Sequence, residues 1–420
     1  MDSNKYISAF FLFFCLLLNV GVSAEDIDFS SDYERIFQIR VVSPDAGSKS
    51  SIGSGFQVSA DGLIMTNYHV VSGYVNSPDS YEIKYVTHDG KKGVLELLDF
   101  DVIADLAILR HPNPVDDFFS LNTQKIEKGV TAYALGNPGD WGIIMVPGPT
   151  NGFVEHSYEE QVLFSGSLNP GMSGGPSLNA VGEVIGVNVA SAGSQLSFLV
   201  PAEKAVNLLK RDRHLQVIDY KKEISEQIKT WQLPRVTGLL EKAWRDENFA
   251  SRQLFGEIRY DFQCWGDTNE SNTDRSVAVV SKTCSAGDRV YLAHDLDAGQ
   301  ISFSFRNSKP IKYNSLQFAK LQRTVMAADN SSRFDHSTNY VCESSFIKAK
   351  GLSDSDSNQE GYHRVITCIR AYKNLEGLYD SLLLFQHHQA KQSFNAHLSL
   401  SALKKDQINA LNKRFIEEVL

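Results

Sequence analysis

The sequence lacks any block of lysines and arginines, and its 41 basic residues are outnumbered by 50 acidic ones, for a net charge of −9. A nucleic-acid-binding protein usually carries a basic surface, so that function is not expected. Beyond residue 24, no apolar run approaches the roughly 20 residues of a membrane-spanning helix. Hydrophobic residues make up 42% and charged residues 22%, which excludes a largely disordered, collagen-like or coiled-coil chain. The 420 residues therefore predict a soluble globular protein, most simply of two domains.

The first 24 residues have the composition of a secretory signal peptide. A weakly basic segment precedes the apolar run Ala9–Val20, and Val22-Ser23-Ala24 offers the small residues that a signal peptidase reads. The run is short for a membrane span, so an uncleaved anchor is the less favoured alternative. Bulky phenylalanines precede Cys15, where a lipoprotein cleavage site needs a small residue. We therefore expect a mature chain in the periplasm or secreted, without stable membrane insertion.

Cysteines are absent between Cys15 and Cys264, so the first half of the mature chain must be held by its apolar core. The remaining ones are Cys264, Cys284, Cys342 and Cys368. Four cysteines in an exported chain suggest two disulfides, for which three pairings exist. Pairing of sequence neighbours, Cys264 with Cys284 and Cys342 with Cys368, is the simplest. A zinc site is disfavoured because no CxxC or HxxxH spacing accompanies these residues.

Residues 32–211 are divided by glycine, asparagine, aspartate and proline into short segments of strand-like composition. Strands at this spacing, without long helices between them, are typical of an antiparallel barrel or sandwich. Asp61-Gly62 and Asp89-Gly90 have the composition of hairpin turns. The expected strands are Arg35–Val42, Ser54–Ser59, Leu63–Thr66, Tyr81–Thr87, Leu106–Arg110, Thr131–Leu135, Gln161–Ser165, Glu183–Val189 and Leu196–Val200.

From Ala202 onwards the apolar residues follow a helical period. One helix includes Ala205–Leu209, and a second, Ile218–Trp231, is expected to end at Pro234. We place the domain boundary in this helical linker, residues 212–234, and predict an α+β accessory domain of unknown type over 235–420. Its expected elements are a helix at Leu239–Phe255, strands at Val277–Val280, Val290–Ala293, Ile301–Phe305 and His363–Tyr372, an exposed loop at Ser353–Gly361, and a final helix with Ile408, Leu411, Phe415 and Val419 on one buried face.

The strongest chemical signal is the segment Asn169-Pro-Gly-Met-Ser-Gly-Gly-Pro176. An activated serine needs its hydroxyl on a tight turn, and backbone N–H groups aimed at the carbonyl oxygen that becomes negative. Gly171 can adopt the backbone angles that let its own N–H and that of Ser173 converge. Gly174 and Gly175 keep the floor of such a site free of side chains. A glycine-rich hairpin with an incidental serine is the alternative.

Two further residues could complete such a site. Two strands joined by the Asp61-Gly62 turn lead into His69, and an imidazole can take the proton of a serine and return it to a leaving amine. Asp105 opens the apolar strand Leu106–Arg110, where burial beside an imidazole would fix its tautomer and stabilise the imidazolium. Alone, each is more often structural, a core histidine or a turn-capping aspartate. With Ser173 they make up the residues of a catalytic triad.

The chain order His69, Asp105, Ser173 is that of the trypsin-like serine proteases, and the motifs resemble the HtrA/Deg-like branch. The similar segments are GSGF, TNYHVV, DLAIL, NPGMSGGP, GEVIGVN and LSFLVP, within about residues 35–210. The resemblance implies a mainly β protease domain, a double six-stranded β-barrel with the triad in the cleft. It implies an oxyanion hole from the N–H groups of Gly171 and Ser173, with Met172 as a further candidate. It also implies an endopeptidase for protein or peptide substrates that needs no cofactor or metal, and a homo-oligomer is common among such enzymes.

Two residues depart from the pattern of this branch. Tyr68 stands where a small or amide residue usually precedes the histidine, and Met172 where the branch has asparagine and many zymogens have aspartate. Without that aspartate a newly freed N-terminal amine would lack a partner, and the chain has no IVGG-type activation sequence. We therefore expect no zymogen cleavage, and the order of the loops would set activity instead.

The expected specificity pocket carries no charge. Ser167, six residues before the nucleophile, stands where trypsin-like specificity needs an acid. The resemblance places Val187-Asn188-Val189 along the wall of the same pocket. An uncharged pocket favours a small or medium apolar residue before the scissile bond. A strand beside it can pair with an extended substrate, which favours unfolded or flexible proteins.

Other interpretations stay open from the sequence. Gly171-Met-Ser-Gly-Gly175 also fits the nucleophile elbow of an α/β-hydrolase, although a strand pattern rather than a helix follows it. The main alternative to the enzyme is a catalytically inactive protease-like module that binds peptides. The accessory domain could dock substrate or support the protease loops; a PDZ domain is disfavoured because its carboxylate-binding loop is not recognisable. His387, His388 and His397 could bind a metal, but a solvated face is favoured.

Overall fold

The computed structural model describes residues 29–44, 48–193, 195–211, 219–250, 252–325, 335–348, 362–389 and 391–420. The expected signal peptide and the Ser353–Gly361 loop lie outside these residues. By their contacts, Met1–Tyr33 and Glu34–Leu420 form separate units. Across the described ranges, no helix is both long enough and apolar enough to cross a membrane.

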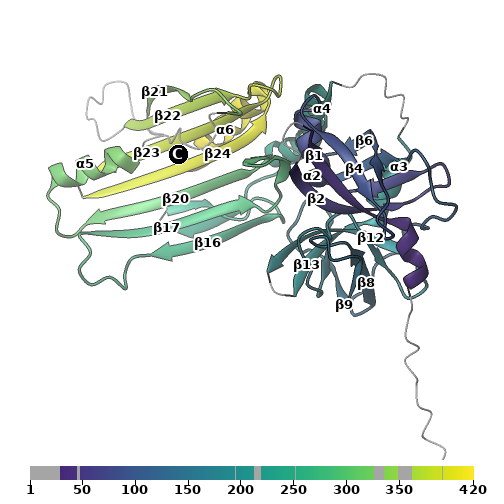
Figure 1. The fold of residues 1–420 in the computed structure, drawn as a ribbon. Helices are drawn as coiled ribbons and strands as arrows, with labels where there is room; N and C mark the ends of the chain where they lie inside the picture. The colour runs from purple at the N-terminus through teal and green to yellow at the C-terminus, as the bar shows by residue number, and fades with distance from the viewer. Residues whose placement is uncertain are drawn as a thin grey trace, which may run out of the picture. The chain divides into compact units, whose positions relative to one another are not determined.

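The first part of Glu34–Leu420 is an antiparallel sheet of seven strands in the order β5-β4-β1-β2-β3-β7-β6. Its strands β1, β2, β4 and β6 are labelled in Figure 1. Asp-Gly turns join β2 to β3 and β4 to β5, and Gly62 and Gly90 have positive φ there, of 81° and 85°. Strand β5 lies at one end of this order and β6 at the other. Its strands are β1 (Ile36–Ser43), β2 (Ser48–Gln57), β3 (Leu63–Thr66), β4 (Glu82–Val86), β5 (Lys92–Val94), β6 (Glu96–Asp101) and β7 (Leu106–Arg110).

The second part is a closed barrel of six strands in the order β10-β13-β12-β11-β8-β9. Its interior is filled by side chains that alternate inward along the strands, and helix α3 (Ala202–Leu209) follows the last of them. The strands are β8 (Thr131–Gly136), β9 (Ile144–Phe153), β10 (Val162–Phe164), β11 (Pro176–Leu178), β12 (Val184–Gly193) and β13 (Leu196–Pro201). The expected mainly β protease domain is therefore present.

Helix α4 (Tyr220–Glu241) runs through Pro234, where the sequence predicts a helix end. The side chain of Asp219 caps its first turn by accepting from the N–H of Lys222 at 3.1 Å. Proline inside a helix costs about 3 kcal/mol because it removes one hydrogen bond and crowds the preceding turn. Trp231, before the proline, packs in the core of the first sheet, and Val236, after it, packs in the core of the accessory sheet. This burial on both sides of Pro234 offsets its cost and keeps the helix continuous.

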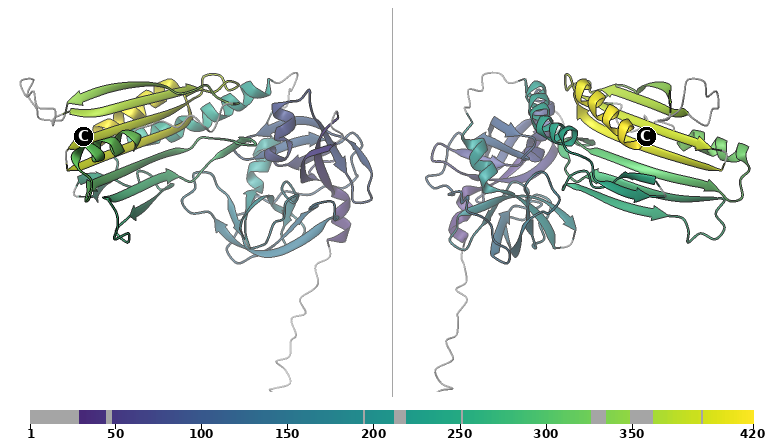
Figure 2. Two further views of the ribbon diagram at one scale, coloured as in Figure 1. Left: turned by 60° about the vertical axis from the view of Figure 1, so that its left-hand side comes forward. Right: turned by 180° about the vertical axis from the view of Figure 1, so that it is seen from behind.

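The accessory half is built on a second antiparallel sheet of seven strands, in the order β16-β17-β20-β24-β23-β22-β21. Helix α6 (Lys405–Val419) lies along β23 and β24 and beside α4, on one side of the sheet (Figure 2). The predicted buried stripe of this last helix is confirmed, because Ile408, Leu411, Phe415 and Val419 are all buried. The strands are β16 (Phe262–Thr268), β17 (Val277–Ala286), β20 (Ile301–Pro310), β21 (Val341–Lys348), β22 (Tyr362–Ala371), β23 (Tyr379–Gln389) and β24 (Gln392–Leu403), and helix α5 (Ser315–Val325) follows β20.

The helix predicted at Leu239–Phe255 is wrong. After α4 ends, the chain forms a hairpin of β14 (Asp246–Phe249) and β15 (Arg252–Phe255). Ala250, in the turn, has a φ of 46°, a left-handed conformation that no helix contains. Phe249 and Phe255 are buried against the sheet, so their apolar spacing reflects a strand pair rather than a helical face.

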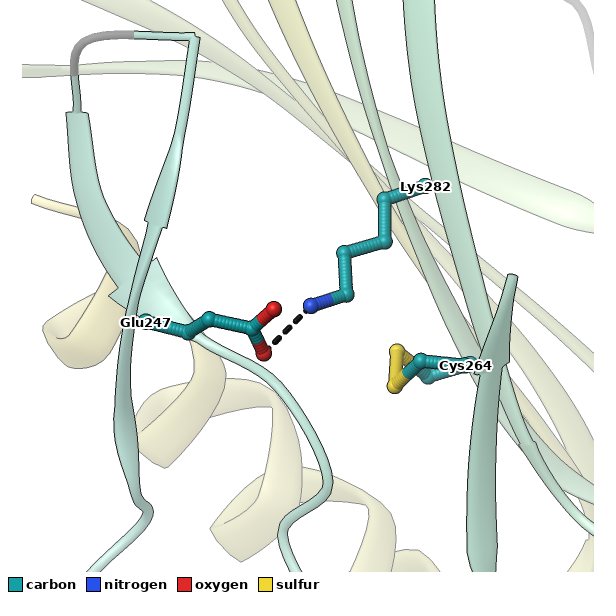
Figure 3. The surroundings of a disulfide bond; sticks show 4 residues. Glu247, Cys264 and Lys282 are labelled. Carbon is teal, nitrogen blue, oxygen red and sulfur yellow. Dashed lines mark ion pairs between the residues drawn. A yellow bond between two sulfur atoms is a disulfide. The ribbon is translucent and has the colours of Figure 1, made fainter. Parts of the chain in front are cut away.

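Each disulfide joins two directly opposed residues on neighbouring strands. Cys264 of β16 pairs with Cys284 of β17, with Cα atoms 4.1 Å apart, and Cys342 of β21 pairs with Cys368 of β22 at 4.0 Å. These are the sequence-neighbour pairings. Beside the first bond, Glu247 of β14 forms an ion pair with Lys282 of β17 (Figure 3). The ion pair links the separate β14–β15 hairpin to β17, and the disulfide links β17 to the edge strand β16.

Replacing both Cys264 and Cys284 by serine should lower the free energy of unfolding. The bond links residues 20 positions apart, so it restricts a loop of that length in the unfolded chain. A loop of this size corresponds to about 3 kcal/mol of stabilisation. Urea unfolding of the oxidised wild type and of the double variant measures the difference. The double serine variant at 342 and 368, whose loop spans 26 positions, should lose a similar amount, and an unchanged urea midpoint would contradict the expectation.

Candidate active site

His69 is held by one carboxylate at two points. It is the second residue of helix α2 (Tyr68–Asn76), which begins directly after β3. Its Nδ1 atom lies 2.7 Å from Oδ2 of Asp105, and its backbone N–H donates to Oδ1 of the same side chain at 2.9 Å. Because Nδ1 faces an acceptor, this contact favours the tautomer with the proton on Nδ1, which leaves Nε2 free to accept a proton.

Asp105 is itself positioned by Asn67, a residue that the sequence analysis missed. Asp105 has a φ of 54°, a left-handed conformation that aspartate tolerates better than most residues. The Asn67 side-chain amide donates to the Asp105 backbone carbonyl at 2.8 Å and is fully buried. Asparagine directly before a helix suggests a capping residue, but this side chain makes no cap hydrogen bond. It holds the turn of Asp105 instead.

The pKa of His69 is raised above its ordinary value of 6.5. Burial of the imidazole works in the opposite direction, because it disfavours the charged form. The charge of Asp105 and the hydrogen bond to it outweigh that burial. The His69 side chain is still 28% exposed, so a substrate can reach the ring.

The segment before Ser173 is a tight turn set by Pro170 and Gly171. The Met172 N–H donates to the Asn169 carbonyl at 3.0 Å, and Gly171 has a φ of 99°. Proline second and a residue of positive φ third are the signature of a type II turn. A Cβ atom at Gly171 would also lie 2.9 Å from the Asn137 carbonyl oxygen, so both the backbone angle and the space require glycine.

Some backbone N–H groups around Ser173 donate hydrogen bonds within the described residues, and others do not. Those of Met172, Gly174 and Gly175 donate to nearby carbonyls. In the described part of the chain, no hydrogen bond uses the N–H of Gly171 or of Ser173. The latter two are the donors open to an incoming oxyanion, whereas the N–H of Met172, the further candidate from the family resemblance, is already engaged.

The Ser173 hydroxyl donates to the backbone carbonyl of Val189 on β12. Within the described residues it makes no hydrogen bond to His69. The backbone segments that carry the two residues are nevertheless in contact, because a Cβ atom at Gly174 would lie 3.0 Å from the backbone nitrogen of Asn67. The residue after the serine thus packs against the residues just before the histidine.

Ser54 holds the serine loop against the first sheet. Its N–H donates to the Ser173 carbonyl at 2.7 Å, and its hydroxyl donates to the Gly171 carbonyl at 2.7 Å. The same hydroxyl accepts from the Asn137 N–H at 2.8 Å, and Ser54 is fully buried. The surrounding GSGF segment resembles a family motif, which by itself assigns no role to Ser54. The structure shows that Ser54 positions the loop on which Ser173 lies.

The expected specificity residues differ in what they can offer. Ser167 is exposed, and its Oγ accepts from the Gln195 N–H at 3.3 Å. The side chains of Val187 and Asn188 are fully buried, and the Asn188 amide donates to the Leu135 carbonyl at 2.9 Å. The backbones of these two residues are also engaged, because Asn188 exchanges hydrogen bonds with Gly174 and Gly175 and Val187 is paired with β11 and β13. Val189 offers the carbonyl that the Ser173 hydroxyl now occupies.

The histidines considered for metal binding lie on the accessory sheet. His387 and His388 are on β23, and His397 is on the neighbouring β24. Nδ1 of His387 lies 3.0 Å from Nδ1 of His363 on β22. Among the described residues, no group of three or more histidine, cysteine, aspartate or glutamate side chains could hold a metal ion.

The fold and site define a class of protein. Residues 53–187 match the family model described as "Trypsin-like peptidase domain". This span includes His69, Asp105 and Ser173, and it runs from β2 into β12. The chain therefore contains a trypsin-like serine protease domain.

Curated relatives of the HtrA type are similar to part of the chain. The chain is 34% identical over 145 residues to a probable periplasmic serine endoprotease DegP-like of Chlamydia trachomatis, covering 33% of this chain and 28% of the relative. It is 31% identical over 210 residues to the protein of the same name from Chlamydia pneumoniae, covering 46% and 42%. It is 29% identical over 186 residues to human serine protease HTRA3, covering 41% and 40%. The chain thus spans less than half of the length of each of these relatives.

Solved structures include similar chains. One is the active form of the Rv3671c protease from M. tuberculosis, with 22% sequence identity and a TM-score of 0.40, covering 45% of this chain and 86% of that one. Another is a serine endoprotease from Yersinia pestis, with 23% identity and a TM-score of 0.37, covering 43% and 62%.

Proposed function

We propose that the chain is an exported serine endopeptidase in which Ser173 is the nucleophile, His69 the general base and acid, and Asp105 the orienting carboxylate. The observation that carries the proposal is the double contact of Asp105 with the ring and the backbone of His69. A surface histidine has no need of a carboxylate that fixes its tautomer, whereas a general base does. The match to the trypsin-like peptidase model and the periplasmic endoprotease relatives support the same activity and an exported location.

The reaction proceeds through an acyl-enzyme. The Ser173 hydroxyl turns from the Val189 carbonyl to His69, and Oγ attacks the carbonyl carbon of the scissile peptide bond while Nε2 takes its proton. The N–H groups of Gly171 and Ser173 donate to the oxyanion. His69 then passes the proton to the amine nitrogen, the C–N bond breaks, and the acyl group stays on Ser173. Water, deprotonated by His69, attacks the acyl carbon, and Ser173 leaves with the proton.

The substrates are unfolded or flexible proteins with a small or medium apolar residue before the scissile bond. An extended backbone can pair with the strand that contains Val189, and the carbonyl of that residue is released when Ser173 turns away. Ser167 adds no charge to the pocket. Among the described residues that we assign to the pocket, no acidic side chain is present to select lysine or arginine.

A proteomic cleavage profile of the mature chain beside its Ser173→Ala variant tests this function. We expect cleavage sites that appear only with the wild type, with apolar residues enriched before the cut. Sites after lysine or arginine would overturn the pocket assignment. If the wild type cleaves nothing while an extended peptide still binds, the inactive peptide-binding module is the better description.

The activity should depend on pH through His69. Protonated His69 cannot accept the proton of Ser173, so kcat/KM falls as the pH drops through the pKa of the histidine. Because Asp105 raises that pKa, we expect the midpoint of the acid limb above pH 6.5. Initial rates on a labelled casein across about pH 5 to 9 give this midpoint. A midpoint below the ordinary histidine value would contradict the assignment of His69 as the base.

A further inference from the structure

A short hairpin in the accessory half packs on the helix that carries His69. It consists of β18 (Val290–Ala293) and β19 (Leu296–Ala298), which form a separate two-stranded sheet. A two-stranded hairpin is at best marginally stable alone, so its contacts must fix its position. Val290, Leu292 and Leu296 are buried in the same core cluster as the apolar residues of α2. The core of the protease sheet is therefore completed by residues of the accessory half.

Helix α2 anchors this hairpin through the backbone carbonyl of Leu292. The Tyr68 hydroxyl donates to it at 2.8 Å, and the Asn76 side-chain amide donates to it at 3.0 Å. Burial raises the pKa of Tyr68, which keeps the hydroxyl protonated and available as a donor. Tyr68 directly precedes the catalytic histidine and replaces the small or amide residue of the HtrA-like pattern. A small side chain at this position could not reach the hairpin.

Tyr291, next to the anchored carbonyl, meets the ring of His69. The two ring centroids lie 6.1 Å apart with their planes at 80°, an edge-to-face arrangement. Asp105 holds Nδ1 of the imidazole, and Tyr291 adds a second contact to the same ring. This contact restricts rotation of the imidazole away from Asp105.

We propose that Tyr291, on strand β18, is a positioning residue for His69. The inference rests on the proposed peptidase function. Tyr291 supplies no reacting atom; it holds the base in the orientation in which Nε2 faces Ser173. The Tyr68–Leu292 hydrogen bond keeps the hairpin in place for this task. The accessory half is then required to align His69, independently of any other role that it has.

Substitutions at Tyr291 in the full-length chain test the proposal. Turnover is measured on fluorescein-labelled casein. The downfield NMR signal of the His69 Nδ1 proton is recorded for the same variants. We expect Tyr291→Leu to lower kcat on the order of 10- to 100-fold, because small misplacements of a catalytic group are costly. KM should stay within about 2-fold, since substrate binding is untouched. The Nδ1 proton signal should broaden through exchange with water, and Tyr291→Phe should restore both readouts.

His294→Ala is the matched control, because His294 lies in the turn of the same hairpin with its side chain 92% exposed. It should leave kcat and the proton signal unchanged, and equal thermal midpoints show that all variants are folded. A higher KM at unchanged kcat would mean that Tyr291 contacts substrate, and would overturn the positioning role. Full kcat with a sharp signal in Tyr291→Leu would also overturn it. If the wild type cleaves nothing, the proposed function fails, and the proton signal alone decides whether Tyr291 positions His69.

Discussion

The Ser173→Ala variant is expected to hydrolyse labelled casein slower than the wild type by a factor on the order of 10³ or more. The hydroxyl is the atom that bonds to the substrate, and triad members act as a unit, so nothing else on the chain can replace it. Residual rate would come only from the backbone N–H groups of residues 171 and 173, which the alanine variant keeps, and from substrate binding. Because Oγ contacts a single backbone carbonyl, its loss should leave the thermal unfolding midpoint unchanged.

A fluorophosphonate that reacts with activated serines gives an independent readout of the same prediction. It should label the wild type and a Ser80→Ala control, in which an exposed serine outside the site is removed, but not Ser173→Ala. Peptidase activity retained by Ser173→Ala would show that another residue is the nucleophile. Labelling that persists at an unchanged rate in this variant would have the same meaning.

The strands of the protease domain could be predicted because their signals are local. Leu63–Thr66 and Leu106–Arg110 are predicted with the bounds that β3 and β7 have. An Asp-Gly turn and an apolar run are properties of neighbouring residues. Helix α2 was missed because Val70 and Val71 have strand propensity. Its form depends on burial of the valines against the sheet and the hairpin, which the sequence does not reveal.

The contrast between local signals and long-range contacts also applies to the candidate active site. The catalytic residues are recognisable from their motifs and chain order, whereas the residues that position them act across long sequence separations. Ser54 reaches Gly171 over 117 residues, and Tyr68 reaches Leu292 over 224. No periodicity or turn pattern links such pairs. Tyr68 did differ from the family pattern in the sequence, but its partner became evident only when the hairpin was placed.

The segment from α4 to β15 was harder to predict from local signals, because a proline and an apolar run there each permit more than one structure. Pro234 lies in a helix that is stabilised by two cores, and this outweighs the local tendency of proline to end it. Phe249 and Phe255 fall within the range predicted as a helix, yet each belongs to a strand of one hairpin. Apolar runs of this length are ambiguous between helix and buried strand. The final helix, α6, is longer than either strand of this hairpin, and its apolar residues keep a helical period. Its buried face was therefore predicted correctly.

The Asp105→Asn variant should lose activity by a factor of about 10⁴, and the present geometry explains why. Both carboxylate oxygens of Asp105 accept from His69, one from the backbone N–H and one from Nδ1. Asparagine has a single acceptor oxygen. If it keeps the backbone contact, its NH₂ group faces Nδ1, which must then be an acceptor. The proton moves to Nε2, and His69 can no longer take the proton of Ser173.

The pKa of His69 separates this explanation from a simple loss of fold. Asp105 raises that pKa through its charge and its hydrogen bond, so the neutral amide should lower it, and titration of the His69 ring by NMR measures the change. Asp89→Asn is the control, because Asp89 is an exposed turn carboxylate and its replacement should change neither kcat nor this pKa. An Asp105→Asn variant with an unshifted His69 pKa and near-normal turnover would mean that the carboxylate does not orient the base. A lowered pKa with lost turnover is the result that the two hydrogen bonds to a single aspartate require.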